Sequence, residues 1–294
     1  GISMSGLAEI LMREGFRVSG SDSHESELTD HLAAAGAKVM YGQAAANITD
    51  DIDLVVYTAA VHTDNPEYAE VVRRGIPMMT RAELLGQIMK NYGEAIAISG
   101  THGKTTTTSM VAEILLAAEK DPTISVGGIL HSIGGNIRVG GPELFVTEAC
   151  EYTNSFLSFF PTMEIILNIE ADHLDFFKDL DDIRHSFRLF AEKLDEKGLL
   201  IINRDIKNYE EISGGLPCRV VTFGHSKESD YSAADITYDA FARPTFTLVE
   251  QGKAAGTITL GVPGEHNVYN ALAAIATAKA LGIPDTAIAD GLLH

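Results

Sequence analysis

The sequence predicts an α/β protein of two doubly wound units, the second of which also carries an antiparallel hairpin region. Short apolar strands alternate with amphipathic helices along most of the 294 residues, as in sheets assembled from βαβ units. A polar turn at residues 91–94 separates two such series. The length favours about two domains, and a composition of 45% hydrophobic and 21% charged residues excludes a disordered chain.

The first series begins with a helix over residues 4–14 and a strand that is expected to end at Val18. A helix over 25–35 and a strand over 38–41 follow. The next strand, over 54–57, is apolar throughout, which predicts burial on both faces. A further helix is expected to begin at 65–67 and to end at 75–77, where Asn-Pro and Gly provide the start and stop signals.

The second series begins with an apolar strand over 95–98. Further strands are expected over 144–147, 163–169, 199–202 and 219–223, with helices between several of them. Residues 231–260 alternate Thr, Tyr, Phe and Val with glycine turns, which predicts antiparallel hairpins attached to the parallel sheet. An alanine-rich helix over 267–281 completes the series.

Charge and cysteine content exclude several classes of partner. The 41 acidic and 22 basic residues leave a formal net charge of −19, so nucleic acid is not expected to bind. Cys150 and Cys218 provide no disulfide framework and are typical of a reducing cytosol. Without a signal peptide or an apolar run of about 18 residues, we expect a cytoplasmic protein with no membrane contact. The sequence predicts no particular oligomeric state.

The strongest chemical signal is a phosphate-binding loop at residues 99–106, Ser-Gly-Thr-His-Gly-Lys-Thr-Thr. It follows an apolar strand and begins a helix, so backbone N–H groups and the helix N-terminus can receive phosphate oxygens. Lys104 is expected to reach the terminal phosphates, and Thr105 to ligate Mg²⁺. The usual first glycine would stand at Ile98, whereas Gly100 lies closer, so the loop is a variant. The alternative is a glycine-rich turn that binds nothing.

Acidic residues follow two of the expected strands. Glu148 ends one of them, at the position where P-loop enzymes hold a metal-linked carboxylate. Residues 170–175, Glu-Ala-Asp-His-Leu-Asp, follow another, and such strand ends face the ligand crevice of an open parallel sheet. Solvated loop charges are the alternative for each of these residues. His173 is a poor Mg²⁺ ligand on chemistry alone, because Mg²⁺ prefers oxygen.

Two weaker signals concern nucleotide recognition. Asp22 falls about twenty residues after the first glycines, where an acid commonly binds a ribose hydroxyl. His266, Asn267 and Asn270 begin the alanine-rich helix and would suit an adenine or ribose edge. In both places a helix N-cap is the alternative, made by Asp22 for the next helix and by Asn267 for its own.

Three motifs together resemble those of the Mur ligase family: the loop Gly100–Thr106, the segment 168–175, and the segment 264–271. Segments in the N-terminal part, at 3–8, 20–22, 57–61, 75–77 and 81–83, are similar to the UDP-binding domain of this family. The resemblance implies a Rossmann-like UDP-sugar domain over 1–93 and a central P-loop ATPase domain over 94–294. A third, amino-acid-binding domain would follow. We therefore expect a fragment that lacks the first strand and the third domain, and that forms no product alone.

The resemblance implies ATP-dependent ligation of L-alanine to the lactyl carboxylate of UDP-N-acetylmuramate through an acyl phosphate, a step of peptidoglycan synthesis. It implies catalytic roles for Lys104, His102 and His173, and Mg²⁺ ligation by Thr105, Glu148 and His173. ATP is expected to contact Gly100, Thr101, His102, Gly103, Lys104, Thr105, Thr106, His266, Asn267 and Asn270. The UDP sugar is expected to contact Ser5, Ser21, Asp22, Thr58 and Ala59.

Some features separate this chain from its possible relatives. The helix expected after His173 carries Arg184 and Arg188 but no lysine before Lys193, so the carbamoylated lysine of several sister ligases is not carried over. A ligase that attaches a recycled peptide to the same UDP sugar is the nearest rival. Folylpolyglutamate synthase lacks an N-terminal UDP domain, so the presence of residues 1–90 argues against that enzyme. A nucleotide-binding module without catalysis is the rival from another class.

Overall fold

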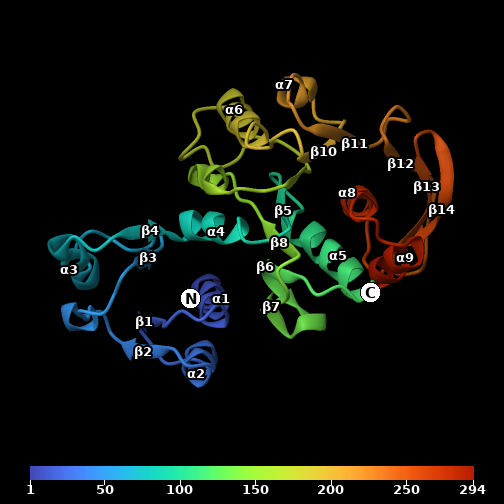
Figure 1. Cartoon of the computed structure of the whole chain (residues 1–294). Helices are drawn as coiled ribbons and strands as arrows, with labels where there is room; N and C mark the ends of the chain where they lie inside the picture. Colours follow the sequence, from blue (N-terminus) through green and yellow to red (C-terminus); the bar gives the residue numbers. More distant parts are fainter. The chain divides into compact units, whose positions relative to one another are not determined.

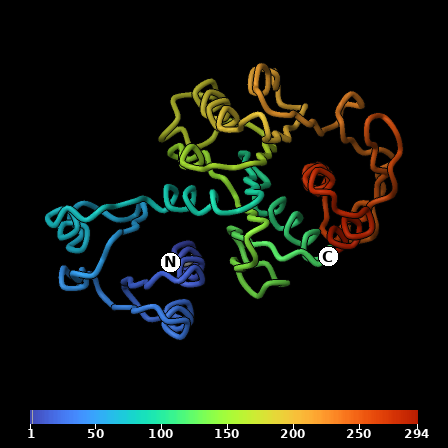
Figure 2. The backbone as a smooth tube through the Cα atoms, viewed as in Figure 1, coloured from blue at the N-terminus to red at the C-terminus, as the bar shows by residue number. Residues whose placement is uncertain are grey.

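The structure, a computed structural model, describes residues 1–294 apart from the side chain of Ile2. The chain forms two compact units, Gly1–Ile88 and Met89–His294, which Figure 2 traces from blue to red. Among the described residues, no helix has both the length and the apolar character that a membrane crossing needs.

The first unit holds two separate pairs of parallel strands. β1 (Ser19–Asp22) pairs with β2 (Lys38–Tyr41), and β3 (Val55–Tyr57) pairs with β4 (Met78–Thr80). Its helices are α1 (Ile2–Arg13), α2 (Glu27–Ala34), α3 (Pro66–Arg74) and α4 (Arg81–Met89), with a short 3₁₀ turn η1 (Ala45–Asn47). Parallel pairs connected through helices are βαβ units, as the predicted fold class requires.

Helix signals in this unit are confirmed in one case and corrected in another. Asn65 caps α3 by accepting a hydrogen bond from the backbone N–H of Glu67 (2.9 Å), and Gly75 ends the helix with φ +68°. Ser26 caps α2 through the backbone N–H of Thr29 (3.3 Å). The N-cap alternative for Asp22 is therefore wrong.

Two strand predictions in this unit are also wrong in detail. The first strand was expected to end at Val18, but β1 begins at Ser19 and includes Asp22. Its side chains are polar, and it is a strand because its backbone groups pair with β2. The apolar strand β3 is only half-buried, and Leu54 before it is 40% exposed. It has a single paired neighbour, β4, whereas burial on both faces was expected.

The second unit is built on one ten-stranded mixed sheet, in the order β14-β13-β12-β11-β10-β9-β5-β8-β6-β7 (Figure 1). The parallel centre contains β5 (Glu94–Ser99), β8 (Leu144–Glu148), β9 (Met163–Ile166), β10 (Leu199–Asn203) and β11 (Arg219–Phe223). Antiparallel hairpins β12 (Tyr231–Tyr238), β13 (Pro244–Glu250) and β14 (Lys253–Thr259) continue one side. The hairpin region predicted at 231–260 is confirmed.

Helices cover both faces of this sheet (Figure 1). α5 (Lys104–Ala117), α8 (His266–Ala280) and α9 (Asp285–Leu293) pack together on one face, and α6 (Leu180–Ala191) and α7 (Glu210–Ser213) lie on the other. Strands such as β5 are buried on both faces, since Ile96 and its neighbour Ala97, which point to opposite faces, are both fully covered. This double burial explains why the central strands are continuous apolar runs.

Two features of the second unit differ from the prediction. β6 (Thr123–Leu130) and β7 (Gly135–Arg138) form an antiparallel hairpin at the other end of the sheet, and the glycines of β6 obscured its strand pattern. β9 ends at Ile166 rather than at residue 169. The chain after it turns towards the loop following β5, where Asn168 accepts a hydrogen bond from the backbone N–H of Thr101 (3.2 Å).

Candidate functional site

The predicted phosphate loop connects the carboxyl end of β5 to the start of α5. β5 lies between β8 and β9 in the sheet. Strands β6 and β8 lie on one side of it and β9 and β10 on the other, so the loop after β5 stands at a topological switch point. Gly103 precedes the helix with φ +88°, and no described side chain caps the first turn. The first N–H groups of α5 therefore have no side-chain cap, as at helix starts that receive phosphate oxygens.

Both loop glycines are required by close contacts. Gly100 has φ +144°, and a Cβ there would lie 2.9 Å from Cβ of Leu167. A Cβ at Gly103 would lie 2.7 Å from Oδ1 of Asn270, at the start of α8. The backbone thus reaches conformations and distances that favour glycine, and Asn270 lies directly against the loop.

A segment after β9 fixes the shape of the loop. The backbone N–H of His102 donates to Oδ1 of Asn168 (2.7 Å), and Nδ2 of Asn168 donates back to the carbonyl of His102 (2.9 Å). The backbone N–H of Glu170 donates to the hydroxyl of Thr101 (2.9 Å), and its carboxylate lies 3.0 Å from Nε2 of His102. Of the acidic segment singled out in the sequence, Glu170 therefore supports the loop.

Lys104 and His173 meet around a residue that the sequence did not single out. The Lys104 ammonium donates to the carbonyl of Gly100 (2.5 Å) and lies 3.5 Å from Oε2 of Glu151. Oε1 of Glu151 lies 3.8 Å from Nε2 of His173. Glu151 was missed because it follows β8 in an irregular segment, although its place just beyond a strand end was a usable signal.

Thr105 and Glu148 both lie close to Gly127 of β6, where a side chain would crowd them. A Cβ at Gly127 would lie 2.5 Å from Oε2 of Glu148 and 3.3 Å from Oγ1 of Thr105. Oε1 of Glu148 is buried and has no hydrogen-bond partner among the described residues. A carboxylate and a hydroxyl are the oxygen ligands that Mg²⁺ prefers, so this pair fits the expected ion.

The metal role of His173 has less support. Within the described part of the chain, no cluster of three or more His, Cys, Asp or Glu side chains could hold a metal ion. Mg²⁺ usually keeps several waters and binds one or two carboxylates together with phosphates, which the pair Thr105 and Glu148 satisfies. His173 lies beside Glu151 instead, and its ligation stays a prediction.

A cavity of about 200 Å³ adjoins the loop on the side of α8. The rings of His225 and Tyr269 stack in its wall with centroids 3.7 Å apart, and burial raises the pKa of Tyr269 to about 12. Aromatic walls with a few polar groups suit a planar heterocycle. The lining residues are His102, Gly103, Leu167, Asn168, Asn203, Phe223, His225, His266, Tyr269 and Asn270.

Two of the predicted nucleotide residues form a pair at the start of α8. Nδ2 of Asn270 donates to Oδ1 of Asn267 (3.0 Å), whose own Nδ2 donates to the carbonyl of Pro263 (2.8 Å). Asn267 is thus not a helix N-cap, because α8 already begins at His266. The bond fixes the Asn270 amide against the phosphate loop.

In the first unit, four of the five predicted UDP-sugar residues lie at or just after strand ends, and the fifth lies in a helix. The hydroxyl of Ser21 donates to the carboxylate of Glu67 (2.7 Å) and accepts from Nε2 of Gln43 (2.9 Å). Ser21 and Asp22 end β1, Thr58 and Ala59 follow β3, and Ser5 lies in α1. Glu67 and Gln43 were not singled out in the sequence, and they take part in the same polar group as Ser21.

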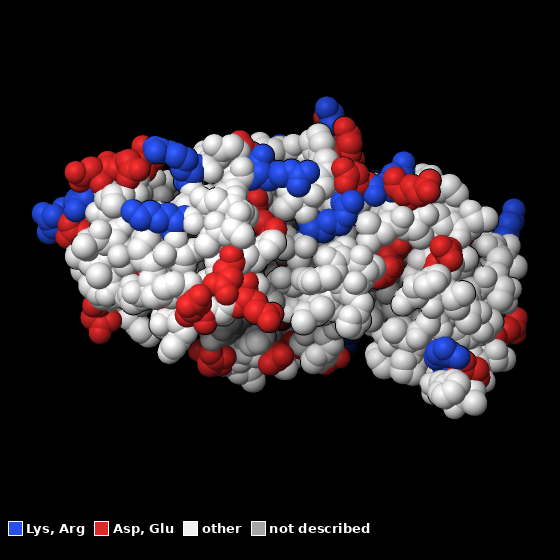
Figure 3. Space-filling model, turned by 90° about the horizontal axis from the view of Figure 1, so that it is seen from below, with Lys and Arg blue, Asp and Glu red and all other residues white. Residues whose placement is uncertain are grey.

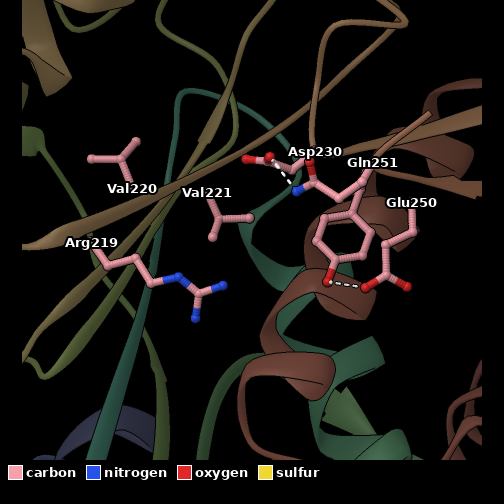
Figure 4. Close-up of a pocket in the computed structure, with 7 residues that line it drawn as sticks. Arg219, Val220, Val221, Asp230, Glu250 and Gln251 are labelled. Carbon is pink, nitrogen blue, oxygen red and sulfur yellow. Dashed lines mark hydrogen bonds between the residues drawn. The ribbon is translucent and has the colours of Figure 1, made fainter.

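A larger cavity of about 380 Å³ lies at the opposite end of the parallel strands, beside Arg219 (Figure 4). Its acidic groups are already paired: Asp230 accepts from Gln251 (2.6 Å), and Glu250 accepts from the Tyr231 hydroxyl (3.2 Å). Since Arg219 begins β11 and the phosphate loop follows the end of β5, this cavity is remote from the loop.

Acidic and basic side chains are interspersed on the face that Figure 3 shows. With a net charge of −19, the protein as a whole does not attract anions. Attraction for the expected phosphate would therefore have to be local, from Lys104 and the N–H groups at the start of α5.

Comparisons with known proteins agree with this geometry. The model of the Mur ligase family catalytic domain matches residues 1–93, and that of the Mur ligase middle domain matches residues 98–278. The chain is 65% identical over 293 residues to the UDP-N-acetylmuramate–L-alanine ligase of Lachnospira eligens, and 62% identical over 292 residues to that of Agathobacter rectalis. Each match includes 99% of this chain but only 64% of the relative's length.

Solved structures show the same fold. The UDP-N-acetylmuramate-alanine ligase of Thermotoga maritima superimposes with a TM-score of 0.84 at 32% identity, over 99% of this chain and 66% of that one. A Neisseria ligase for UDP-N-acetylmuramate and the peptide L-alanyl-γ-D-glutamyl-meso-diaminopimelate superimposes with a TM-score of 0.88 at 27% identity. The match covers 100% of this chain and 94% of that one.

Proposed function

The chain belongs to the Mur ligase family, and we propose that its protein joins L-alanine to the lactyl carboxylate of UDP-N-acetylmuramate at the expense of ATP. The observation that carries the proposal is the loop between β5 and α5, in which Lys104 and an uncapped helix start meet the pair Thr105 and Glu148. The identity of 62–65% to curated alanine-adding ligases supports the choice of substrates.

The reaction has two steps in this proposal. The lactyl carboxylate oxygen attacks the γ-phosphorus of ATP, the bond to the β-phosphate oxygen breaks, and an acyl phosphate and ADP result. The neutral amine of L-alanine then attacks the acyl carbon, and inorganic phosphate leaves from the tetrahedral intermediate as the amine loses its proton. Such phosphoryl transfer needs mainly positioning and neutralisation of charge.

Residues of this chain supply those two needs. Lys104 and the first N–H groups of α5 neutralise the phosphates, with Gly100, Thr101, Gly103 and Thr106 shaping the loop. His102 stands at the mouth of the loop, where its ring faces both Glu170 and solvent, and it contacts a substrate carboxylate or phosphate.

The nucleotide base occupies the cavity beside the loop. His225 and Tyr269 stack in its wall, and His266, Asn267 and Asn270 provide polar groups for the adenine or ribose edge. Asn270 also lies against Gly103, so the base and the phosphates are placed by neighbouring residues.

Thr105 and Glu148 would hold one Mg²⁺ ion, which when bound neutralises phosphate charge. His173 would be a ligand of a second ion. The chain's own contribution is the glycine at position 127. Without a Cβ there, the carboxylate and the hydroxyl are not crowded by β6, and the buried Oε1 of Glu148 is available for bonding.

The UDP sugar binds the first unit in this proposal, at the ends of β1 and β3. Asp22 accepts a ribose hydroxyl, and Ser5, Ser21, Thr58 and Ala59 contact the remainder of the ligand. The two cysteines of the described chain are free thiols, as a cytoplasmic place in peptidoglycan synthesis requires.

Phosphate release by the full-length protein tests the proposal. UDP-N-acetylmuramate and ATP are supplied with L-alanine, glycine, L-serine or the tripeptide L-Ala-γ-D-Glu-meso-diaminopimelate. The products are identified by mass spectrometry. We expect UDP-N-acetylmuramoyl-L-alanine as the main product. Preference for the tripeptide would instead assign the reaction of the Neisseria neighbour, which matches this chain over 94% of its own length.

A further inference from the structure

Glu151 is a buried carboxylate without the partners that such a group normally has. Its side chain is 2% exposed, and neither carboxylate oxygen has a hydrogen-bond partner among the described residues. Burying an ionised carboxylate is costly unless charge compensates it. The compensation comes from two groups of the proposed site, the Lys104 ammonium at 3.5 Å and the His173 ring at 3.8 Å.

The sheet order explains why these three residues meet. Lys104 follows β5, His173 follows β9 and Glu151 follows β8, and these three strands are adjacent in the order β9-β5-β8. The carboxyl ends of the three parallel strands therefore present their loops at one edge of the sheet. Glu151 is held there by a chain reversal in which Thr153 and Asn154 have φ of 55° and 57°.

We propose that Glu151 is a positioning residue for the ligation reaction, a single carboxylate that sets the Lys104 ammonium and the His173 ring relative to each other. This inference rests on the proposed function. Nothing in the sequence motifs assigned a role to Glu151, and its separate oxygens face the two side chains, Oε2 towards Lys104 and Oε1 towards His173.

The distances indicate positioning rather than a tight ion pair. At 3.5 and 3.8 Å both contacts are longer than a hydrogen bond, while the Lys104 ammonium donates at 2.5 Å to the carbonyl of Gly100. Lys104 is thus attracted both to Glu151 and to an arriving phosphate. The Glu151 carboxylate therefore opposes binding of the free nucleotide. It also keeps the Lys104 ammonium and the His173 imidazole in place during the reaction.

Removal of the charge therefore has two effects of opposite direction. In Glu151→Gln the ammonium is released to the nucleotide, so ATP without Mg²⁺ should bind severalfold more tightly. The turnover number should fall by about 10- to 100-fold, as is usual when a residue that orients a catalytic group is lost. A residue with a merely structural role would weaken binding and turnover together.

The experiment uses the full-length protein and four forms: wild type, Glu151→Gln, Glu151→Asp and the control Glu228→Gln. Glu228 pairs with Arg204 at the surface, where its side chain is 79% exposed, so its variant should behave as wild type. Isothermal calorimetry with ATP in EDTA gives the dissociation constant, phosphate release gives kcat and KM, and thermal unfolding shows whether each form is folded.

We expect Glu151→Asp to bind ATP as wild type does, because it keeps the charge, but to turn over more slowly because its shorter side chain cannot reach both partners. Wild-type kcat in a folded Glu151→Gln would overturn the inference, and so would weaker ATP binding in that variant. If wild type itself releases no phosphate with UDP-N-acetylmuramate and L-alanine, the proposed function fails. The calorimetric comparison then still decides whether Glu151 restrains Lys104.

Discussion

Substitution of Gly127 by alanine directly tests the proposed metal-binding pair Thr105 and Glu148. The added Cβ would stand 2.5 Å from Oε2 of Glu148, whereas ordinary contact begins at 3.4 Å, so the carboxylate must retreat by about 0.9 Å. Gly127 lies in β6 outside the left-handed region of φ, and alanine is compatible with that backbone. The change should therefore displace a site residue without unfolding the protein.

A displacement of about 1 Å at a reacting centre can lower a rate by 10²-fold, which corresponds to about 2.7 kcal/mol in the activation free energy. We expect kcat/KM for ATP to fall by about this factor in Gly127→Ala and the Mg²⁺ concentration for half-maximal rate to rise. Phosphate release at increasing Mg²⁺ measures both quantities in the full-length protein.

The adjacent glycine provides a matched control. A Cβ at Gly128 would meet Cγ2 of Thr105 at 3.5 Å, which is ordinary contact, so Gly128→Ala should keep nearly the wild-type rate. Equal rates and equal Mg²⁺ requirements in Gly127→Ala and wild type would show that Thr105 and Glu148 do not hold the ion.

Three further changes test other parts of the molecule. Lys104→Ala should abolish ATP turnover while circular dichroism and cooperative unfolding persist; near-normal activity would refute the phosphate-loop assignment. Asp22→Ala should lower the affinity for the UDP sugar and leave that for ATP unchanged, as measured by calorimetry, and the reverse result would contradict the assignment of ligands to units. Glu164 is fully buried in β9 without hydrogen-bond partners among the described residues, and burial raises its pKa well above the ordinary 4.5. A raised pKa means that its contribution to stability is present below pH 4.5 and is lost as the pH rises, so Glu164→Gln should gain stability over wild type as the pH rises above 4.5 in urea titrations; a difference independent of pH would count against this.

Local signals predicted the parts of the site that depend on neighbours in sequence. The loop at Gly100–Lys104 was visible because a strand, two glycines and a helix start follow one another within a few residues. Asn65 and Gly75 marked the two ends of α3 for the same reason. Central strands were equally clear, since burial on both faces leaves a run of apolar residues.

Parts that depend on distant contacts could not be predicted in this way. Gly127 was not singled out in the sequence, and its closeness to Glu148 follows only from the pairing of β6 with β8. Glu151 lies in irregular backbone, and its two partners come from other strand ends. Asn267 had the sequence of an N-cap, yet α8 begins one residue earlier and its amide bonds Pro263 and Asn270 instead.

The arrangement also suits the anionic substrates of the proposed reaction, although the protein is acidic. At the edge formed by β9, β5 and β8, positive potential comes from Lys104 and from the first turn of α5, both of which act over short distances. The carboxylates of Glu148 and Glu151 lie beside this potential; Glu151 is buried, whereas Glu148 is half-buried with its Oε1 covered. In the proposed function, a free phosphate would be opposed by two carboxylates, while a phosphate accompanied by Mg²⁺ would satisfy Glu148 and leave Lys104 shared with Glu151. Selection for the metal-bound nucleotide would then follow from the positions of the acidic residues, and the overall charge of −19 would contribute nothing to attracting it.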